Sequence, residues 1–287
     1  MRASERIWLG FLAPKFFFFI LFIILPILLS GFIAFSHITP GHMSFVGLAN
    51  WQYVLNDHNF WRSVGITTLY AVVTTPLSIL LALFLASQLM TLPPFWRNFF
   101  RAAFYLPSVT AVVIMALVWQ WLFNHGHGFI DDLFSTFGLH RVGWLINPHI
   151  ALWSIMLMAV LTPPGMGIVL YMSQMGSIPE EYYEAARLDG AGAIRQFTQI
   201  TAPLVTPTTL YLAVLHTIAA FQIFTVIYIM TGGGPGYATT TIVAEIYDMG
   251  FQSFHLGRAG AEAILLAALL TIFSYIQFKV LGRHVEY

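Results

Sequence analysis

The sequence predicts an all-α integral membrane protein with six transmembrane helices, organised as a single domain over residues 1–287. The chain is 58% hydrophobic and only 8% charged, and its mean hydropathy is +0.78. A hydrocarbon core about 30 Å thick needs roughly 20 apolar residues per helical span. Six segments meet that requirement, at approximately 11–35, 65–90, 102–124, 149–174, 205–230 and 260–281.

The first and fourth segments carry features of their own. The run FLAPKFFFFILFIILPILLSGFIAF is longer than a signal-peptide core of about 7 to 15 residues, and no A-x-A cleavage site follows it. It is therefore expected to be a retained helix. In the fourth segment, LTPPGMG contains Pro163 and Pro164, which are expected to break or kink the helix because proline lacks the backbone N–H.

Two external loops are also interpretable. The stretch TGGGPGYATTT, which begins at Thr231, is too rich in glycine for a helix and suits a tight turn. The stretch 129–137 is amphipathic, and we expect it to lie along the membrane interface.

The distribution of lysine and arginine predicts the orientation, because these residues concentrate in cytoplasmic loops. With the amino terminus inside, nine of the twelve fall on the cytoplasmic side and three outside. The inner set is Arg2, Arg6, Lys15, Arg97, Arg101, Arg187, Arg195, Lys279 and Arg283, and the outer set is Arg62, Arg141 and Arg258. Both termini and the segment between spans four and five are therefore expected in the cytoplasm.

That segment, 178–202, is the most polar part of an otherwise apolar chain. Pro179 suits a first helical position, and the two glutamates that follow it favour the positive end of a helix. The sequence Asp189-Gly190 is expected to end this helix, because glycine tolerates the left-handed conformation of a C-terminal cap. A second short helix should run from Ala191 and stop before Pro203.

The result is a helix-turn-helix elbow, for which two interpretations stand equal on the residues alone. Its small residues leave the backbone accessible for the close approach of another protein. An ordinary solvated loop would have the same composition.

The string EAARLDGAGAIRQFTQITAPLVTP resembles the EAA signature of permeases from binding-protein-dependent ABC importers, E-A-A-x3-G followed by x9-I-x-x-P. The matching positions are Glu184, Ala185, Ala186, Gly190, Ile200 and Pro203, while Ala202 replaces the customary leucine. Other strings resemble the carbohydrate branch, and specifically its maltose-type and glycerol-phosphate-type first permease. They are FLAPKFFFFILFIILPIL, FVGLANW, FRAAFYLPSVTAVVIMALVWQWLFN, IPEEYYEAARLDGA and TGGGP.

This resemblance implies the type I ABC importer permease fold in a prokaryotic cytoplasmic (inner) membrane. It implies that the elbow is a coupling helix seated in a cleft of an ATPase. The coupling residues would be Glu184, Ala185, Ala186, Arg187, Asp189 and Gly190. The implied partners are a second homologous permease, two copies of an ABC ATPase, an extracytoplasmic solute-binding protein and membrane lipid.

The chain itself carries no sign of ATP chemistry. A phosphate-binding P-loop needs a lysine behind a glycine-rich loop, yet the only lysines are Lys15 and Lys279, and neither lies in such a motif. We therefore expect no cofactor in this chain, with ATP and Mg bound by the partner ATPase, and neither catalytic nor metal-binding residues. A net charge of zero gives no reason to propose nucleic acid as a partner.

In relatives similar to the maltose permease, the sugar lies between the spans that flank the elbow. Counting from the two flanking motifs gives the candidate solute-pathway residues Thr162, Gly165, Met166, His216, Ala219, Ala220 and Gln222. Ideal helix geometry puts His216 and Gln222 about 240° apart, so both could instead face neighbouring helices. Glu262 is expected to snorkel to the interface near the end of span six, with Arg258 as a candidate partner.

The predicted function is import of sugars or oligosaccharides by alternating access, coupled to ATP hydrolysis in partner subunits. The candidate pathway residues offer little aromatic surface for a sugar ring, so a polyol or a phosphorylated solute such as glycerol 3-phosphate is the alternative. A non-transport membrane scaffold is the alternative of another class. A secondary transporter is disfavoured because the spans carry no ladder of acidic residues.

Overall fold

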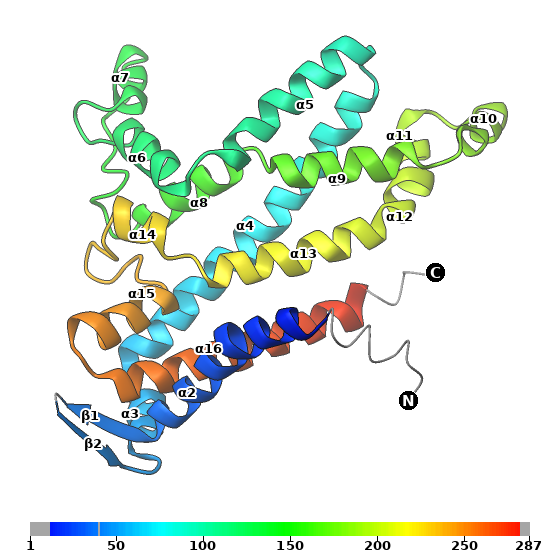
Figure 1. Cartoon of the computed structure of the whole chain (residues 1–287). Coiled ribbons are helices and arrows are strands. Elements are labelled where there is room, and N and C mark those ends of the chain that lie inside the picture. The colour runs from blue at the N-terminus through cyan, green and yellow to red at the C-terminus, as the bar shows by residue number, and fades with distance from the viewer. Residues whose placement is uncertain (1–11, 40, 282–287) are drawn as a thin grey trace, which may run out of the picture. The chain divides into compact units, whose positions relative to one another are not determined.

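The structure is a computed structural model that describes residues 12–39 and 41–281, and these residues are predominantly helical (Figure 1). They form two compact units, and each unit combines segments that are distant in sequence. The first comprises residues up to Arg62 together with Glu245–Leu269, and the second comprises Ser63–Ala244 and the residues from Leu270 onward. Three helices contribute to both units: α4 (His58–Met90), α15 (Ile242–Tyr247) and α16 (Leu256–Leu281).

The first unit is built around the close approach of α16 to the amino-terminal helix. Its other elements are η1 (Ile20–Ile24), α2 (Leu25–Ala34), β1 (Ser36–Thr39), β2 (His42–Phe45), α3 (Ala49–Asn56) and η3 (Asp248–Gln252). The buried side chain of Asn50 donates hydrogen bonds to the carbonyls of Ala34 (3.0 Å) and Ser36 (2.9 Å). Gly257 lies against the same carbonyl of Ser36, where a Cβ atom would be 2.1 Å from the oxygen.

The antiparallel hairpin of β1 and β2 corrects the all-α prediction. Ser36 pairs with Phe45 and Thr39 pairs with His42. Strands of four residues leave only two positions on each face, which is too short a run for an alternating pattern to be recognised in the sequence.

The second unit contains α5 (Pro94–Val109), α6 (Val112–Leu122), α7 (Phe129–Thr136), α8 (Ala151–Leu161), α9 (Gly165–Gly176), α10 (Glu180–Leu188), α11 (Ala193–Gln196), η2 (Phe197–Thr201), α12 (Ala202–Leu204), α13 (Thr206–Phe221) and α14 (Thr225–Met230). The chain leaves α9, passes through the elbow and returns along α13 (Figure 1). The predicted tight turn at Thr231 is confirmed, since Gly232, Gly233 and Gly236 all have positive φ angles.

Four described helices are long and apolar enough to cross a membrane, namely Leu12–Ala34, His58–Met90, Ala151–Gly176 and Leu256–Val280. Two bent pairs raise the number to six if each is one span. They are α5 with α6, bent by 96°, and Ala193–Leu204 with α13, bent by 65°. The predicted break in the fourth segment is confirmed, because α8 ends at Leu161 and α9 begins at Gly165.

The core of the second unit lies between α4, α9 and α13. Small residues bring α4 and α9 together, since a Cβ atom on Gly167 would be only 3.1 Å from that of Ala82. Close backbone approach of this kind favours helix association in membranes, where burial of apolar surface supplies little driving force. Tyr171, which is fully buried, hydrogen-bonds Thr209 across 2.8 Å and joins α9 to α13.

A second close contact joins α9 to α5 and leads to a stability prediction. A Cβ atom on Gly165 would be 2.6 Å from the carbonyl oxygen of Phe104, whereas one on Gly176 would meet nothing within 4 Å. Gly165→Ala should therefore destabilise the purified protein by roughly 1–3 kcal/mol, because backbone atoms cannot easily move aside. Gly176→Ala, in the same helix, should be neutral or slightly stabilising.

The measurement is the thermal unfolding midpoint of both variants in detergent. Equal midpoints for Gly165→Ala and the unaltered protein would contradict the close packing of α5 and α9.

Candidate functional site

The elbow is formed by α10, a tight turn and the short helices that follow. The turn has Gly190 at φ +76°, and the backbone N–H of Ala191 donates to the carbonyl of Ala186 across 2.8 Å. This six-to-one hydrogen bond with a left-handed glycine is a Schellman-type helix end. The predicted role of Gly190 as the helix terminator is therefore confirmed.

The second arm of the elbow is longer than predicted. Instead of stopping before Pro203, the helix continues through α12, which includes this proline near its first position, and the bend follows at Val205. The π-helical turn η2 lies just before this proline, and local π adjustments of this kind accommodate a proline within a membrane helix. Tyr183 and Thr201 share a hydrogen bond of 2.9 Å, which links α10 to the second arm.

The elbow presents an exposed surface to its surroundings. Of the predicted coupling residues, Glu184, Ala185, Arg187, Asp189 and Gly190 are exposed and Ala186 is half-buried. Arg187 already pairs with Glu180. Two apolar side chains that the prediction missed are the most prominent, because Leu188 is 90% exposed and Ile194 is 83% exposed. Their signal in the sequence was the presence of large apolar residues in the most polar segment.

A pocket of about 400 Å³ lies in the second unit, at the ends of α9 and α13 that are remote from the elbow. Its size falls within the range of roughly 300–1,000 Å³ that small-molecule sites occupy. The lining residues come from five helices and two helix breaks. They are Tyr70, Thr74, Thr75, Ser78, Val112, Ala159, Thr162, Pro164, His216, Ala219, Ala220, Gln222, Ile223, Phe224, Thr225 and Val226.

Five of the seven candidate pathway residues meet in this pocket: Thr162, His216, Ala219, Ala220 and Gln222. His216 and Gln222 both line this pocket, so neither only faces a neighbouring helix. α13 ends at Phe221, and Gln222 still donates its backbone N–H to the carbonyl of Ile218 across 3.1 Å before α14 begins at Thr225. The pocket therefore extends from α13 over the break that follows Gln222.

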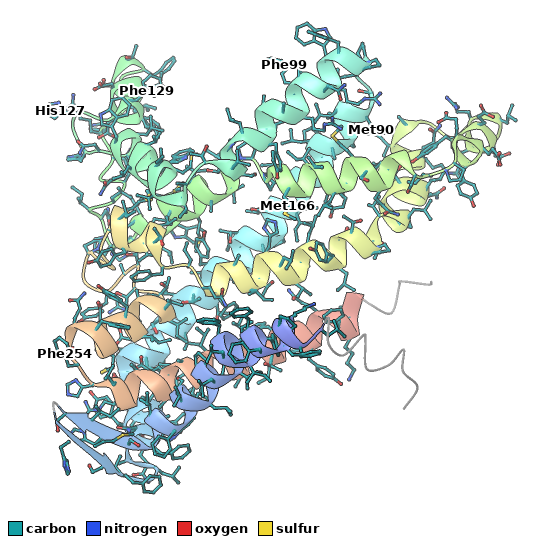
Figure 2. The ribbon with its side chains drawn as sticks, in the orientation of Figure 1. Met90, Phe99, His127, Phe129, Met166 and Phe254 are labelled. Carbon is teal, nitrogen blue, oxygen red and sulfur yellow. The ribbon has the colours of Figure 1, made fainter. Side chains whose placement is uncertain are left out.

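The other two candidates lie elsewhere. Gly165 is buried against the backbone of α5. Met166, labelled in Figure 2, is 52% exposed and does not line the pocket. The positions differ because the backbone is extended at Thr162 and turns again at Pro164, so counting residues along an ideal helix could not predict their direction.

The prediction missed the contribution of α4. Tyr70, Thr74 and Ser78 follow one another at intervals of four residues, which places them on one side of a helix, and all three are buried and line the pocket. The hydroxyl of Thr75 also lies there, buried and without a hydrogen-bond partner. The sequence signal for this contribution was the row of polar side chains on one side of an otherwise apolar span.

Glu262 lies in the first unit and contradicts the expected snorkelling. Its side chain is 0% exposed, and neither carboxyl oxygen has a hydrogen-bond partner. Arg258 does not pair with it, because its guanidinium stacks over the ring of Tyr53 at 3.6 Å. The charged groups that act on it electrostatically, Glu245 and Asp57, are themselves acidic.

The acidic groups around Glu262 affect one another. Burial raises the pKa of the Glu245 carboxyl, and repulsion from Asp57 and Asp248 raises it further. Burial likewise raises the pKa of Asp248. Within residues 12–39 and 41–281, no group of three or more His, Asp or Glu side chains could hold a metal ion.

A family of known proteins matches most of the chain. The inner membrane component of binding-protein-dependent transport systems matches residues 78–287. The chain belongs to this family. The resemblance found in the EAA-like segment is thereby confirmed, and the chain is a membrane permease of such a transport system.

Relatives with assigned substrates agree with that membership. The arabinooligosaccharides transport system permease protein AraP of Bacillus subtilis (strain 168) is 29% identical over 95% of this permease and 87% of the relative. The sn-glycerol-3-phosphate transport system permease protein UgpA of Agrobacterium fabrum (strain C58 / ATCC 33970) is 30% identical over 85% of this permease and 83% of the relative.

A solved structure shares the fold. It is a chain from a bacterial alginate ABC transporter, crystallised in complex with an alginate pentasaccharide-bound periplasmic protein. The TM-score is 0.86 with 21% identity, over 97% of this permease and 96% of that chain.

The raised pKa of Glu245 predicts how the stability of the protein depends on pH. Because the pKa of Glu245 is raised on folding, the folded protein binds this proton more tightly than the unfolded chain does. Its stabilising contribution is complete below the unfolded pKa of about 4.3 and is lost as pH rises through the folded pKa. The slope is at most about 1.4 kcal/mol per pH unit for one proton.

The unfolding midpoint should therefore fall with rising pH more steeply in the unaltered protein than in Glu245→Gln. Glu181→Gln, which alters an exposed carboxyl of the elbow, serves as the control. Parallel pH profiles for the unaltered protein and Glu245→Gln would refute the shift.

Proposed function

We propose that this permease forms the translocation pathway of an ABC importer for sugars or oligosaccharides, with the pocket as the solute site and the elbow as the coupling element. One observation carries the proposal: α9 and α13 each run from the elbow to the pocket. Their 12 and 16 residues correspond to about 18 Å and 24 Å of helix. A displacement of the elbow therefore reaches the solute site through two rigid segments.

The breaks at the pocket supply the points of bending. Thr162 and Pro164 line the pocket from the break between α8 and α9, and Gln222 and Ile223 line it from the break between α13 and α14. Irregular backbone within a membrane is tolerated where it lines a cavity, and transporters commonly bind solute at such broken helices. ATP-driven movement of the elbow would open the pocket to each side in turn, provided that partners contact the two states differently.

The lining chemistry favours a neutral, hydroxylated solute. The hydroxyls of Thr74, Thr75 and Ser78, the amide of Gln222 and the imidazole of His216 can exchange hydrogen bonds with sugar hydroxyls. The lining also includes the aromatic rings of Tyr70 and Phe224, which were absent from the residues considered in the sequence. Among the residues that the structure describes, the lining contains no Lys or Arg, the side chains that recognise phosphate groups.

A phosphorylated solute such as glycerol 3-phosphate, or a polyol, remains the alternative because UgpA is a relative. A phosphate would then have to be bound by the partner permease. AraP, the relative named for arabinooligosaccharides, agrees with the sugar assignment.

The proposed assembly contains this chain, a second homologous permease, two copies of an ABC ATPase that bind ATP and Mg, and an extracytoplasmic solute-binding protein. The chain would act as one transmembrane domain of six spans with both termini and the elbow in the cytoplasm, as the Lys and Arg distribution predicts. The coupling residues would be Glu184, Ala185, Ala186, Arg187, Asp189 and Gly190, joined by the exposed Leu188 and Ile194. A non-transport scaffold would use the same elbow but would have no need of the pocket.

The coupling role predicts different effects at two glycines of the elbow. An added side chain meets nothing within 4 Å at either Gly190 or Gly192, but only Gly190 has a positive φ angle. Gly190→Val should strain the turn by roughly 1–2 kcal/mol and reduce solute-stimulated ATPase activity and transport, with the complex still assembled. Gly192→Val, at φ −69°, should leave both activities near normal.

The measurements are co-purification of the subunits and ATPase activity in proteoliposomes. Full stimulation in Gly190→Val would contradict the coupling role.

The pocket assignment predicts a separate effect on solute handling. Ala219→Phe adds a ring to the pocket lining and should abolish or strongly reduce transport while ATPase activity without solute persists. Leu215→Phe is the control, because Leu215 is exposed on the same helix outside the pocket.

Uptake of candidate labelled sugars and of glycerol 3-phosphate, each presented with its binding protein, tests the pocket and the solute class together. Normal uptake in Ala219→Phe would contradict the pocket assignment. Uptake of glycerol 3-phosphate, with no uptake of any of the sugars, would overturn the assignment of a sugar as the solute.

A further inference from the structure

We propose that α7 is a membrane-surface anchor, in which Phe129, Leu133 and Phe137 insert into the interfacial layer of the lipid bilayer. These three residues are called the anchor face below. They are 57%, 46% and 75% exposed. Their spacing of four residues places them along one side of α7 and its C-terminal cap.

The remaining residues of α7 divide into two further faces. Ile130, Asp131 and Phe134 point toward the protein, since Asp131 is fully buried and the other two are half-buried. Asp132 and Ser135 are exposed on the polar side. The helix therefore has one face toward the protein, one largely exposed apolar face and one polar face. A helix that lies in the plane of a membrane interface needs such an arrangement.

The rotation of α7 is fixed by the carboxylate of Asp131. It accepts hydrogen bonds from the backbone N–H groups of Gly126 (3.2 Å) and Val142 (3.1 Å) and from the indole N–H of Trp144 (2.8 Å). The Nδ1 atom of His125 lies 3.3 Å away.

These contacts keep Asp131 ionised. Burial alone raises the pKa of Asp131, but the hydrogen bonds and the charge of His125 outweigh it and hold the pKa below its usual range. The exposure of the anchor face is therefore a fixed feature of the structure and does not arise from a loosely attached helix.

The anchor face continues an apolar surface of the neighbouring span. α6 belongs to a bent pair that meets the criteria for a membrane span, and it packs against α7. Apart from Val112, which lines the pocket, its exposed side chains are Val113, Ile114, Leu117, Val118 and Trp121. Trp121 lies in the last turn of α6. At the end of a membrane span, an aromatic residue typically marks the boundary between hydrocarbon and water.

The orientation of α7 agrees with this position. In Figure 1, α7 stands at the end of the second unit remote from the elbow and runs across the direction of α9 and α13. In Figure 2, Phe129 and His127 project to different sides of this segment. His127, His140 and Arg141 are exposed, and Arg141 pairs with Asp132 of the polar face across 3.9 Å. The ion pair of Arg141 with Asp132 thus lies on the polar face, which headgroups and water would occupy.

The absence of cysteine from the chain permits a direct test of depth. Leu133→Cys on the anchor face and Ser135→Cys on the polar face are matched positions of one helix. Each would carry a nitroxide label in the complete transporter, in proteoliposomes, with any accessible cysteine of the other subunits replaced. Collision with oxygen reports contact with lipid, and collision with a water-soluble nickel chelate reports contact with water.

The label at Leu133→Cys should have an oxygen-to-nickel accessibility ratio several-fold higher than the label at Ser135→Cys. Phe129→Cys should resemble Leu133→Cys, and Asp132→Cys should resemble Ser135→Cys, which guards against a local distortion at one site. High nickel accessibility at both faces would overturn the proposal. Low accessibility of Leu133→Cys to both reagents would also overturn it, because the anchor face would then be covered by a protein subunit.

Discussion

A helix surrounded by hydrocarbon must satisfy its own backbone hydrogen bonds, and this constraint decides where the chain can bend. The two breaks that line the pocket are tolerated because other groups supply the missing partners. At the first, both the backbone N–H and the hydroxyl of Thr162 donate to the carbonyl of Met158. At the second, the hydroxyl of Thr241 donates to the carbonyl of Ile223 across 2.9 Å. The glycine-rich turn after α14 thus helps to hold the pocket open.

Hydrogen bonds of buried and half-buried threonines hold that turn in place. Thr231 and Thr239 share a hydrogen bond of 2.7 Å, and Thr240 donates to the carbonyl of Gly233. The hydroxyl of Thr67 in α4 accepts a hydrogen bond from the backbone of Ile242 across 2.9 Å. The chain therefore passes from the pocket through a fixed turn to α4, which lines the same pocket with Tyr70 and Thr74.

Much of the architecture could be predicted because local chemistry determines it. Gly190 ends α10 as its sequence context required, and Pro163 and Pro164 break the fourth segment. The details that failed depend on contacts between distant segments. Nothing near Gly165 in the sequence indicates that the carbonyl of Phe104 will lie against it. The break between α13 and α14 contains no proline, so local chemistry did not indicate that the chain would bend there.

Glu262 illustrates the same limit. Its distance from the predicted end of span six suggested snorkelling, but snorkelling requires a free path to the interface. The small residues Gly257 and Gly260 draw α16 against α2 and β1, and the close packing buries the carboxyl completely. The burial of the Glu262 carboxyl therefore depends on the small residues around it. Its distance along the chain from the predicted end of the span does not determine it.

Rigid helices and the breaks between them determine how movement of the elbow could reach the pocket. In the proposed mechanism, the elbow is held by the Schellman turn at Gly190 and by the hydrogen bond between Tyr183 and Thr201. Between the elbow and the pocket, α9 and α13 are joined by Tyr171 and Thr209. Rigid elements move as bodies, and the backbone angles change at the few residues between them. The helix breaks at Thr162 and Gln222 are therefore where displacement of the elbow would alter the shape of the pocket.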